Sequence, residues 1–502
     1  VQTWLAQKAA NSLSEKLHTR VTVKKVDFAF FNKLSLQGVM VEDRQKDTLL
    51  YAGDLRVNIT DWFFVKDKIT LHYISLDDAV INMHRSDSVW NYQFLADYFS
   101  SPGGGGSKKS IDLDVKTIHL TNIRFNKIDG WVGQNMVASI KKADITIDQL
   151  DLNKKVLKIH DIYLEEPLFA LTDYTGKRPP VANLTTALQK IPGVSALQWN
   201  NAGWVVSVDK LQLYKGAFLN DRETDRKPYT DQFDGAHIAF SMISGTIDEV
   251  LFKNDTLHAN LLLTAKEKNG LEIKKIQSTM KLTPEIMEFS KLDLETNNSH
   301  ISNYYAMKYN DFNGDMKNFL KAVTLEGHFT NTSISSKDLA IFAPQLANWN
   351  RVFYLEGNIK GPVDNISGKG LKIKSGNSIF DGDISLSGLP DINTTFIDLE
   401  SNNLRTNYND LVAIIPQLKN ITQPQLSKLG NIYYKGNFTG FINDFVTYGT
   451  ISTNLGVIAA DLNMKLPENA APTYSGKIVT RGFRLGDFIN SSDVGRISLN
   501  GK

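Results

Sequence analysis

One pattern of alternating apolar and polar residues occurs twice in this chain. Residues 74–83 (ISLDDAVINM) align with residues 162–171 (IYLEEPLFAL) at an offset of 88 residues. In both copies the apolar residues alternate on either side of an acidic pair, Asp77-Asp78 or Glu165-Glu166. Alternation with a period of two is typical of a β-strand with one apolar face. A chain that repeats such a face is predicted to build a surface rather than one reactive centre.

The two acidic pairs raise the question of catalysis, because paired carboxylates perform glycoside hydrolysis. A catalytic pair occurs once in a chain, whereas these pairs return at the same point of each repeat. We therefore expect Asp77-Asp78 and Glu165-Glu166 to be turn residues between strands.

The C-terminal half contains a repeat of its own. Residues 339–346 (LAIFAPQL) match residues 411–418 (LVAIIPQL) at an offset of 72, and residues 353–361 match 432–440 at an offset of 79. Each copy predicts a short helix that ends near a proline and is followed by several strands. Units of this length that consist of strands predict a sheet extended by addition, in which each unit needs its neighbours.

These patterns predict a mostly β fold: an elongated, curled or twisted antiparallel β-sheet groove, a β-taco-like repeat array with short helices. The expected segments are an amphipathic N-terminal helix (1–20), a first β repeat (21–100), a Gly/Ser linker (101–110), a second β repeat (111–174), a linker with a short helix (175–203), a third β repeat region (204–335), and two helix-plus-strands repeats (336–408 and 409–502), the last truncated.

Composition excludes several classes of function. The net charge of +2 over 502 residues offers no electrostatic case for nucleic-acid binding. There is no cysteine, and the nine histidines show no metal-ligand spacing, so we expect neither a metal nor a cofactor. Neither a phosphate-binding glycine loop nor a Gly-x-Ser-x-Gly motif occurs, and we expect no enzyme. No apolar run is long enough to span a membrane.

The repeated apolar face is itself the candidate site. Its rows consist mainly of Ile, Leu, Val and Met, which favours an aliphatic trough over a sandwich packed with aromatic residues. A long exposed trough needs a ligand, and an acyl chain is the natural one. The residues that we expect to line it are Leu55, Val57, Ile59, Ile81, Met83, Ile145, Ile147, Phe169, Leu171, Ile238, Phe240, Leu261, Leu263, Leu355, Ile359, Tyr434 and Phe438.

A family resemblance adds to this interpretation. Residues 1–10 (VQTWLAQKAA) resemble the segment after the membrane anchor of the TamB family. Residues 49–59, 74–85 and 89–95 resemble the N-terminal module of the AsmA-like superfamily, which includes that family. The resemblance is strongest over residues 1–175 and continues more weakly to residue 502.

The resemblance implies a periplasmic protein of Gram-negative bacteria, anchored in the inner membrane, that carries phospholipid along a hydrophobic groove toward the outer membrane. It also implies an Omp85-type outer-membrane barrel as partner. On this basis we expect an anchor before residue 1 and a further domain after residue 502. One alternative is a scaffold that assembles outer-membrane proteins by strand addition at sheet edges. Another is a secreted carbohydrate-binding protein or adhesin, which would expose aromatic platforms.

Overall fold

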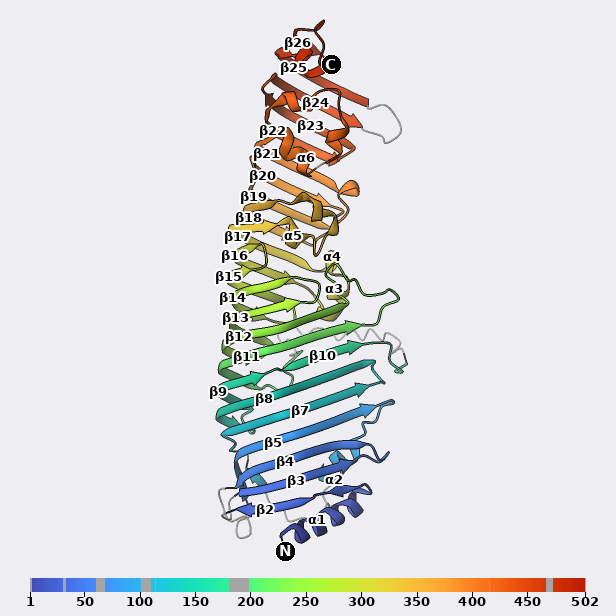
Figure 1. Cartoon of the computed structure of the whole chain (residues 1–502), viewed down its shortest axis with the longest axis vertical. Helices are drawn as coiled ribbons and strands as arrows, with labels where there is room; N and C mark the ends of the chain where they lie inside the picture. The colour runs from blue at the N-terminus through green and yellow to red at the C-terminus, as the bar shows by residue number, and fades with distance from the viewer. Residues whose placement is uncertain are drawn as a thin grey trace, which may run out of the picture. The chain divides into compact units, whose positions relative to one another are not determined.

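The computed structural model divides the chain into two units, Val1–Glu272 (unit 1) and Ile273–Lys502 (unit 2). Both consist mainly of strands with a few short helices, which confirms the predicted mostly β fold (Figure 1). The residues that the structure describes are 2–29, 33–59, 68–100, 110–112, 114–179, 198–414, 416–465 and 473–501. Residues 101–109 of the predicted Gly/Ser linker (101–110) lie outside them, and so does the whole short helix predicted over residues 183–191.

Unit 1 begins with α1 (Gln2–Leu17), the predicted amphipathic helix. Its residues Ala10 and Leu17 are buried in a cluster with Val21, Leu49 and Phe94. The last of these belongs to α2 (Gln93–Ser100), so two helices cover the first strands of the sheet. Among the residues described, no helix is both long enough and apolar enough to cross a membrane.

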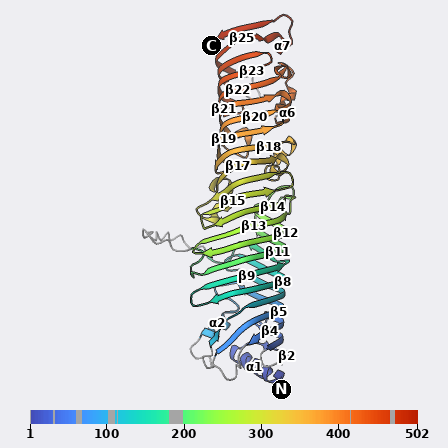
Figure 2. The ribbon, with the colours of Figure 1, turned by 90° about the vertical axis from the view of Figure 1, so that its left-hand side faces the viewer.

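The strands of unit 1 follow one another in chain order (Figures 1 and 2). They are β1 (Val21–Thr22), β2 (Lys25–Ala29), β3 (Lys33–Glu42), β4 (Thr48–Ile59), β5 (Lys68–Arg85), β6 (Ser110–Asp112), β7 (Thr117–Asp129), β8 (Gln134–Asp151), β9 (Val156–Glu165), β10 (Leu168–Asp173), β11 (Val205–Arg222), β12 (His237–Lys253) and β13 (Thr256–Glu267). Most pairs are antiparallel, as predicted. However, β5 pairs in parallel with β6 and β7, and β11 pairs in parallel with β9 and β10.

Unit 2 is an antiparallel sheet throughout its described pairs. Its strands are β14 (Glu272–Leu282), β15 (Ile286–Glu295), β16 (His300–Lys308), β17 (Thr324–Ser335), β18 (Val352–Gly361), β19 (Asn365–Ser375), β20 (Ser378–Ser387), β21 (Phe396–Asn407), β22 (Asn431–Phe441), β23 (Asp444–Thr453), β24 (Gly456–Lys465), β25 (Thr473–Arg484) and β26 (Arg496–Gly501). Its helices are α3 (Phe312–Lys317), α4 (Phe319–Ala322), α5 (Ser336–Leu339), α6 (Tyr408–Ile414) and α7 (Leu485–Ile489), with short 3-10 helices η1 (Pro344–Trp349), η2 (Ile392–Thr394), η3 (Pro416–Asn420) and η4 (Leu426–Leu429).

The strands of unit 1 share a line of distorted backbone, which we call the crease. It passes through neighbouring positions on successive strands: Gly38, Gly53, Asp78, Asn122, Lys141, Glu166 and Lys215. Five of these seven residues have φ values between +50° and +60°. An extra residue of this kind bends a strand and shifts its alternation by one position. Consequently Leu76 and Ala79, three residues apart, both lie on the apolar face.

This geometry corrects the interpretation of the acidic pairs. Asp78 lies inside the continuous strand β5, and Glu166 lies between β9 and β10, which pair one after the other along β8. The predicted turns are therefore wrong, because the shifted alternation at a bend looks in sequence like the end of a strand. The repeat itself is real in three dimensions: φ is +54° at Asp78 and +50° at Glu166, 88 residues later.

Unit 2 has a crease of its own, a line along which small residues lie on the apolar face. They lie opposite one another on β20 to β24: Gly382, Ser401, Gly436, Gly449 and Ala460. A Cβ atom placed on Gly436 would lie 2.2 Å from the carbonyl oxygen of Tyr448. The neighbouring backbones thus approach so closely at this line that a side chain would not fit.

The helices α5 and α6 mark the C-terminal repeat that the sequence predicted. Asp338 of α5 accepts hydrogen bonds from the side chains of Thr296, Asn298 and Ser299, in the turn before β16. Asp410 of α6, 72 residues later, accepts bonds in the same way from the turn before β20, including one from the backbone N–H of Asn377 at 2.9 Å. Both carboxylates are buried. Each therefore ties a helix to the turn between two earlier strands.

Candidate functional site

A row of mostly aromatic side chains crosses six strands on the apolar face of unit 1; we call it the aromatic row. Its members lie opposite one another in register, and opposite residues share a face. They are Ile81 on β5, Phe125 on β7, Ala138 on β8, Phe169 on β10, Phe218 on β11 and Phe240 on β12. The rings of Phe169 and Phe218 stack with centroids 6.3 Å apart. Three predicted lining residues, Ile81, Phe169 and Phe240, therefore meet in one row.

The remaining predicted residues on this side of the crease extend the row. Met83, Leu171 and Ile238 lie two positions from Ile81, Phe169 and Phe240 on the same strands, and so on the same face. All three are half-buried.

Across the crease, two of the predicted residues belong to a tighter cluster. Ile147 is buried together with Val115, Ile159 and Val208, and Ile145 packs against them. Leu55 and Val57 lie opposite Leu76 and Ile74, while Leu261 and Leu263 lie opposite Ile247 and Gly245. Leu261 is buried like Ile147. The side chain of Ile59 lies outside the described part of the structure. This side of unit 1 is packed more like a core.

In unit 2 the predicted residues flank two glycines with positive φ, Gly357 on β18 and Gly436 on β22. Leu355 lies opposite Ile373, and Ile359 lies opposite Gly368. Phe438 lies opposite Leu399 on β21. All the apolar members of this set are half-buried, while the alternate residues of β18 and β22 are exposed.

Tyr434 spans the crease rather than simply lining one side of it. One of its ring atoms, Cε2, lies 3.0 Å from where a Cβ on Gly449 would be. Its hydroxyl lies 2.9 Å from Oγ1 of Thr447 and donates to the carbonyl oxygen of Asn437 at 2.7 Å. Both partners lie beyond Gly436 or Gly449. The large ring therefore fills the space that the two glycines leave empty.

The degree of burial separates this face from an ordinary core. Phe169 is 40% exposed, and Ile81, Leu355, Ile359, Tyr434 and Phe438 are half-buried rather than buried. Side chains between two packed layers are commonly almost completely buried. The environment is nevertheless apolar: burial raises the pKa of Tyr305, on β16 opposite Gly327, to about 12. A partly exposed, strongly apolar face can accept apolar ligands.

A polar margin borders the aromatic row near the ends of the strands. Arg85 on β5 donates from Nε and a terminal nitrogen to the two carboxylate oxygens of Asp129 on β7, each at 2.7 Å. These bonds lower the pKa of Asp129. Gln134 on β8 donates to Asp173 on β10 at 3.0 Å, and the guanidinium of Arg85 lies 4.5 Å from the ring centroid of Trp90. The face thus passes from aromatic to charged within a few residues.

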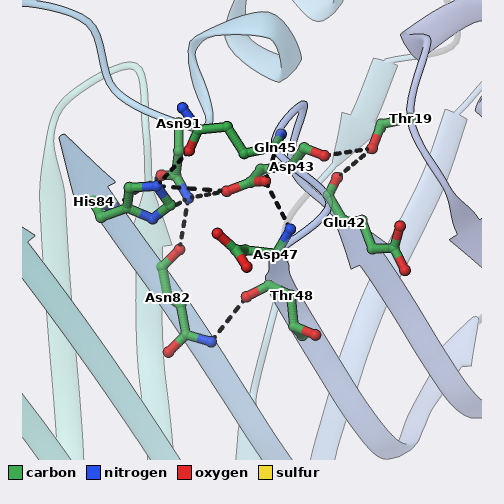
Figure 3. Close-up of polar contacts among 9 residues, drawn as sticks. All are labelled: Thr19, Glu42, Asp43, Gln45, Asp47, Thr48, Asn82, His84 and Asn91. Atoms are coloured by element: carbon green, nitrogen blue, oxygen red, sulfur yellow. Dashed lines mark hydrogen bonds and ion pairs between the residues drawn. The ribbon is translucent and has the colours of Figure 1, made fainter. Parts of the chain in front are cut away.

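A second polar cluster surrounds Asp43, in the turn between β3 and β4 (Figure 3). The buried carboxylate accepts hydrogen bonds from the backbone N–H groups of Gln45 and Asp47 and from the side-chain amide of Asn91. His84 lies 3.7 Å from it and, with Asp47, completes a group whose potential ligand atoms lie within 4.8 Å of one another. The hydrogen bonds identify Asp43 as the residue that fixes this turn and joins it to Asn91, two residues before α2.

The acidic pairs make contacts along the crease. Asp78 accepts a hydrogen bond from the side chain of Asn122 at 2.9 Å. Lys141 lies 2.7 Å from Glu165 and 3.2 Å from Glu166. The hydrogen bond to Glu165 is the main reason that the pKa of Lys141 is raised. These carboxylates therefore link adjacent strands at the bend.

Sequence reasoning missed three members of the aromatic row: Ala138 and the two phenylalanines Phe125 and Phe218. Both phenylalanines lie beyond a crease residue of their strand, Asn122 or Lys215, where the alternation shifts phase. A search for alternation that allows one shift within each strand would have included them. Comparison with known proteins adds no identification: no protein-family model matches the chain, and no curated protein matches its sequence.

Proposed function

We propose that this protein carries phospholipids by holding their acyl chains against the apolar face of its sheets. The observation that supports this proposal best is the aromatic row, six strands wide and only half-buried. Withdrawing one CH₂ group from water contributes about 0.8 kcal/mol, so a chain of 16 carbons contributes about 12 kcal/mol when it is fully buried. A face that shields even half of that chain removes a large part of the barrier to its transfer.

Movement along the face requires no catalytic group. Neighbouring strands lie about 4.8 Å apart, and each presents a similar apolar side chain in the same register. An acyl chain that shifts by one strand exchanges one set of contacts for an equivalent set, so no step exposes it fully to water. The bends at the crease favour a trough that keeps the tails dry. The polar margin at Arg85 and Asp129 would keep a headgroup at the wet edge.

The place of this activity follows from the family resemblance alone. We propose a periplasmic protein attached to the inner membrane by a segment outside residues 1–502, delivering phospholipid toward the outer membrane. An Omp85-type barrel would be its partner there.

The direct test is to identify the lipids that accompany the purified protein. The chain is purified without detergent, and bound lipids are extracted and quantified by mass spectrometry. Phe169→Arg and Phe438→Arg place a charge on the apolar face, and we expect each to reduce bound phospholipid at least fivefold. Ala170→Arg and Asn437→Arg place the same charge on the next residue, which faces the other way.

The outcome distinguishes an open face from a closed one. If Phe169→Arg unfolds unit 1, the face is a closed core and the proposal is wrong. If the protein binds no phospholipid, or if Ala170→Arg reduces binding as much as Phe169→Arg, the apolar face is not the binding site. Circular dichroism of each variant shows whether the fold is intact.

A further inference from the structure

The polar face of unit 2 contains a hollow of about 590 Å³ across β16 to β20, where the apolar Ile379 lies opposite Lys374. The residues whose side chains face it lie opposite one another in register. Ser333 is opposite both His300 and Tyr354, and Tyr354 is opposite Lys374. Glu356 and Lys372 form the adjacent opposite pair. Because Leu355 and Ile373, on the same strands, belong to the apolar face, this set belongs to the other face.

The backbone explains why a hollow forms at this position. Asn331 on β17 has a φ of +49°, and the pairing of β17 with β18 shifts register between Phe329 and Thr332. The pairing of β18 with β19 shifts again between Glu356 and Asn358. Two adjacent irregularities bend the strands locally and separate their side chains. The volume lies within the range of sites that bind small ligands, about 300–1,000 Å³.

The side chains around the hollow include an aromatic ring, on which a flat ligand can pack, and charged groups, which can bind the polar groups of a ligand. Tyr354 is 57% exposed, although it lies in the middle of a strand pair rather than at an edge. Lys372 and Lys374 are both exposed, and neither forms an ion pair with any residue that the structure describes. His300 is oriented by Asp293, whose carboxylate lies 2.9 Å from Nε2.

We propose that this hollow binds an acidic oligosaccharide. The flat C–H face of a sugar ring would pack on Tyr354, because an aromatic ring offers a large and rigid contact area. The carboxylate of the sugar would pair with Lys372 or Lys374, and its hydroxyl groups would bond with Glu356 and Ser333. This site lies on the face opposite the lipid-binding face, so it is independent of the lipid proposal.

Two sugars that differ only in the group at C6, charged in one and neutral in the other, test the proposal. Digalacturonic acid carries carboxylates where galactobiose carries hydroxymethyl groups. Isothermal titration of the full chain with each should show the acid binding at least tenfold more tightly, equivalent to about 1.4 kcal/mol. High salt should weaken the binding of digalacturonic acid and leave the affinity for galactobiose unchanged.

Variants locate the binding. We expect Tyr354→Ala to reduce the affinity for both sugars at least tenfold, and the double variant Lys372→Gln/Lys374→Gln to bring the acid down to the affinity of galactobiose. Tyr448→Ala on β23 is the matched control, because that tyrosine is 67% exposed outside the hollow. Equal affinity for the two sugars, equal effects of Tyr354→Ala and Tyr448→Ala, or the absence of binding by both sugars would each overturn the proposal.

Discussion

Gly449 on β23 tests whether the crease of unit 2 depends on the absence of side chains. Its backbone has no positive φ, so an added methyl group acts by size alone. That methyl would lie 2.5 Å from the carbonyl oxygen of Lys435, 2.9 Å from Cα of Gly436 and 3.0 Å from a ring atom of Tyr434. Two of the three neighbours are backbone atoms, which cannot rotate away. Overpacking of this kind costs about 1–3 kcal/mol.

The displaced ring adds a second contribution. Moving Tyr434 weakens its hydrogen bonds to Thr447 and Asn437, each of which contributes about 1 kcal/mol. We therefore expect Gly449→Ala to lower the free energy of unfolding by about 2–4 kcal/mol and the Tm of unit 2 by roughly 4–16 °C. Scanning calorimetry of the full chain measures the shift and shows whether only one transition moves.

The control is Gly495→Ala, because a Cβ at that position has no neighbour within 4 Å. The double variant Gly449→Ala/Tyr434→Phe separates the two contributions, since the phenylalanine ring has no hydroxyl to lose. If Gly449→Ala shifts the Tm by no more than Gly495→Ala, the strands do not need the close approach and the account of the crease is wrong.

Three further predictions concern buried polar groups. Asp338→Ala leaves the donors in the turn before β16 without an acceptor, so we expect a loss of about 3 kcal/mol in denaturant unfolding, whereas a change below 0.5 kcal/mol would contradict the anchoring role. The two bonds from Arg226 hold the pKa of the buried Asp234 well below its ordinary value. This pair therefore stabilises above about pH 4 and loses its contribution as the pH falls, so Asp234→Asn should flatten the stability profile below pH 4; parallel profiles would refute this. Burial raises the pKa of Tyr305, so its neutral form stabilises the fold below about pH 10, and this contribution is lost as the pH rises to about 12. Tyr305→Phe should remove this loss of stability and the last phenolate step in ultraviolet absorbance. An unchanged titration would place the tyrosine in water.

The alternation of apolar residues was sufficient to predict strands, but not the bend within them. At Asp77-Asp78 the phase of alternation shifts by one residue, which is visible in the sequence. A shift of phase can mean a turn or a bulge, and local residues do not distinguish them, because aspartate is common in both. The distinction depends on whether the strand continues to pair, and that depends on neighbours far away in sequence, such as Asn122.

The direction of pairing was also beyond the sequence pattern. Alternation predicts one apolar face for a strand, whatever the direction of its neighbour. A parallel pair needs a long connection between its strands. Such connections exist between β5 and β7, where α2 lies, and between β10 and β11. The length of these connections was apparent in the sequence, whereas the strand with which β7 or β11 would pair was not.

The two creases reach one result by different chemistry, and this difference explains why their sequences look unalike. In unit 1, Asp78, Asn122, Glu166 and Lys215 adopt positive φ, which costs a residue with a side chain about 1–2 kcal/mol. The exposed polar contacts of these residues contribute little free energy to offset that cost. The apolar residues on both sides of the bend must therefore supply the rest, as Ala79 does by being completely buried. In β22 and β23 of unit 2, Gly436 and Gly449 face the apolar side and bear no such strain from a side chain. A single sequence motif for the crease does not exist, because what recurs is a requirement of the backbone: a bend that places no large or charged side chain on the apolar face.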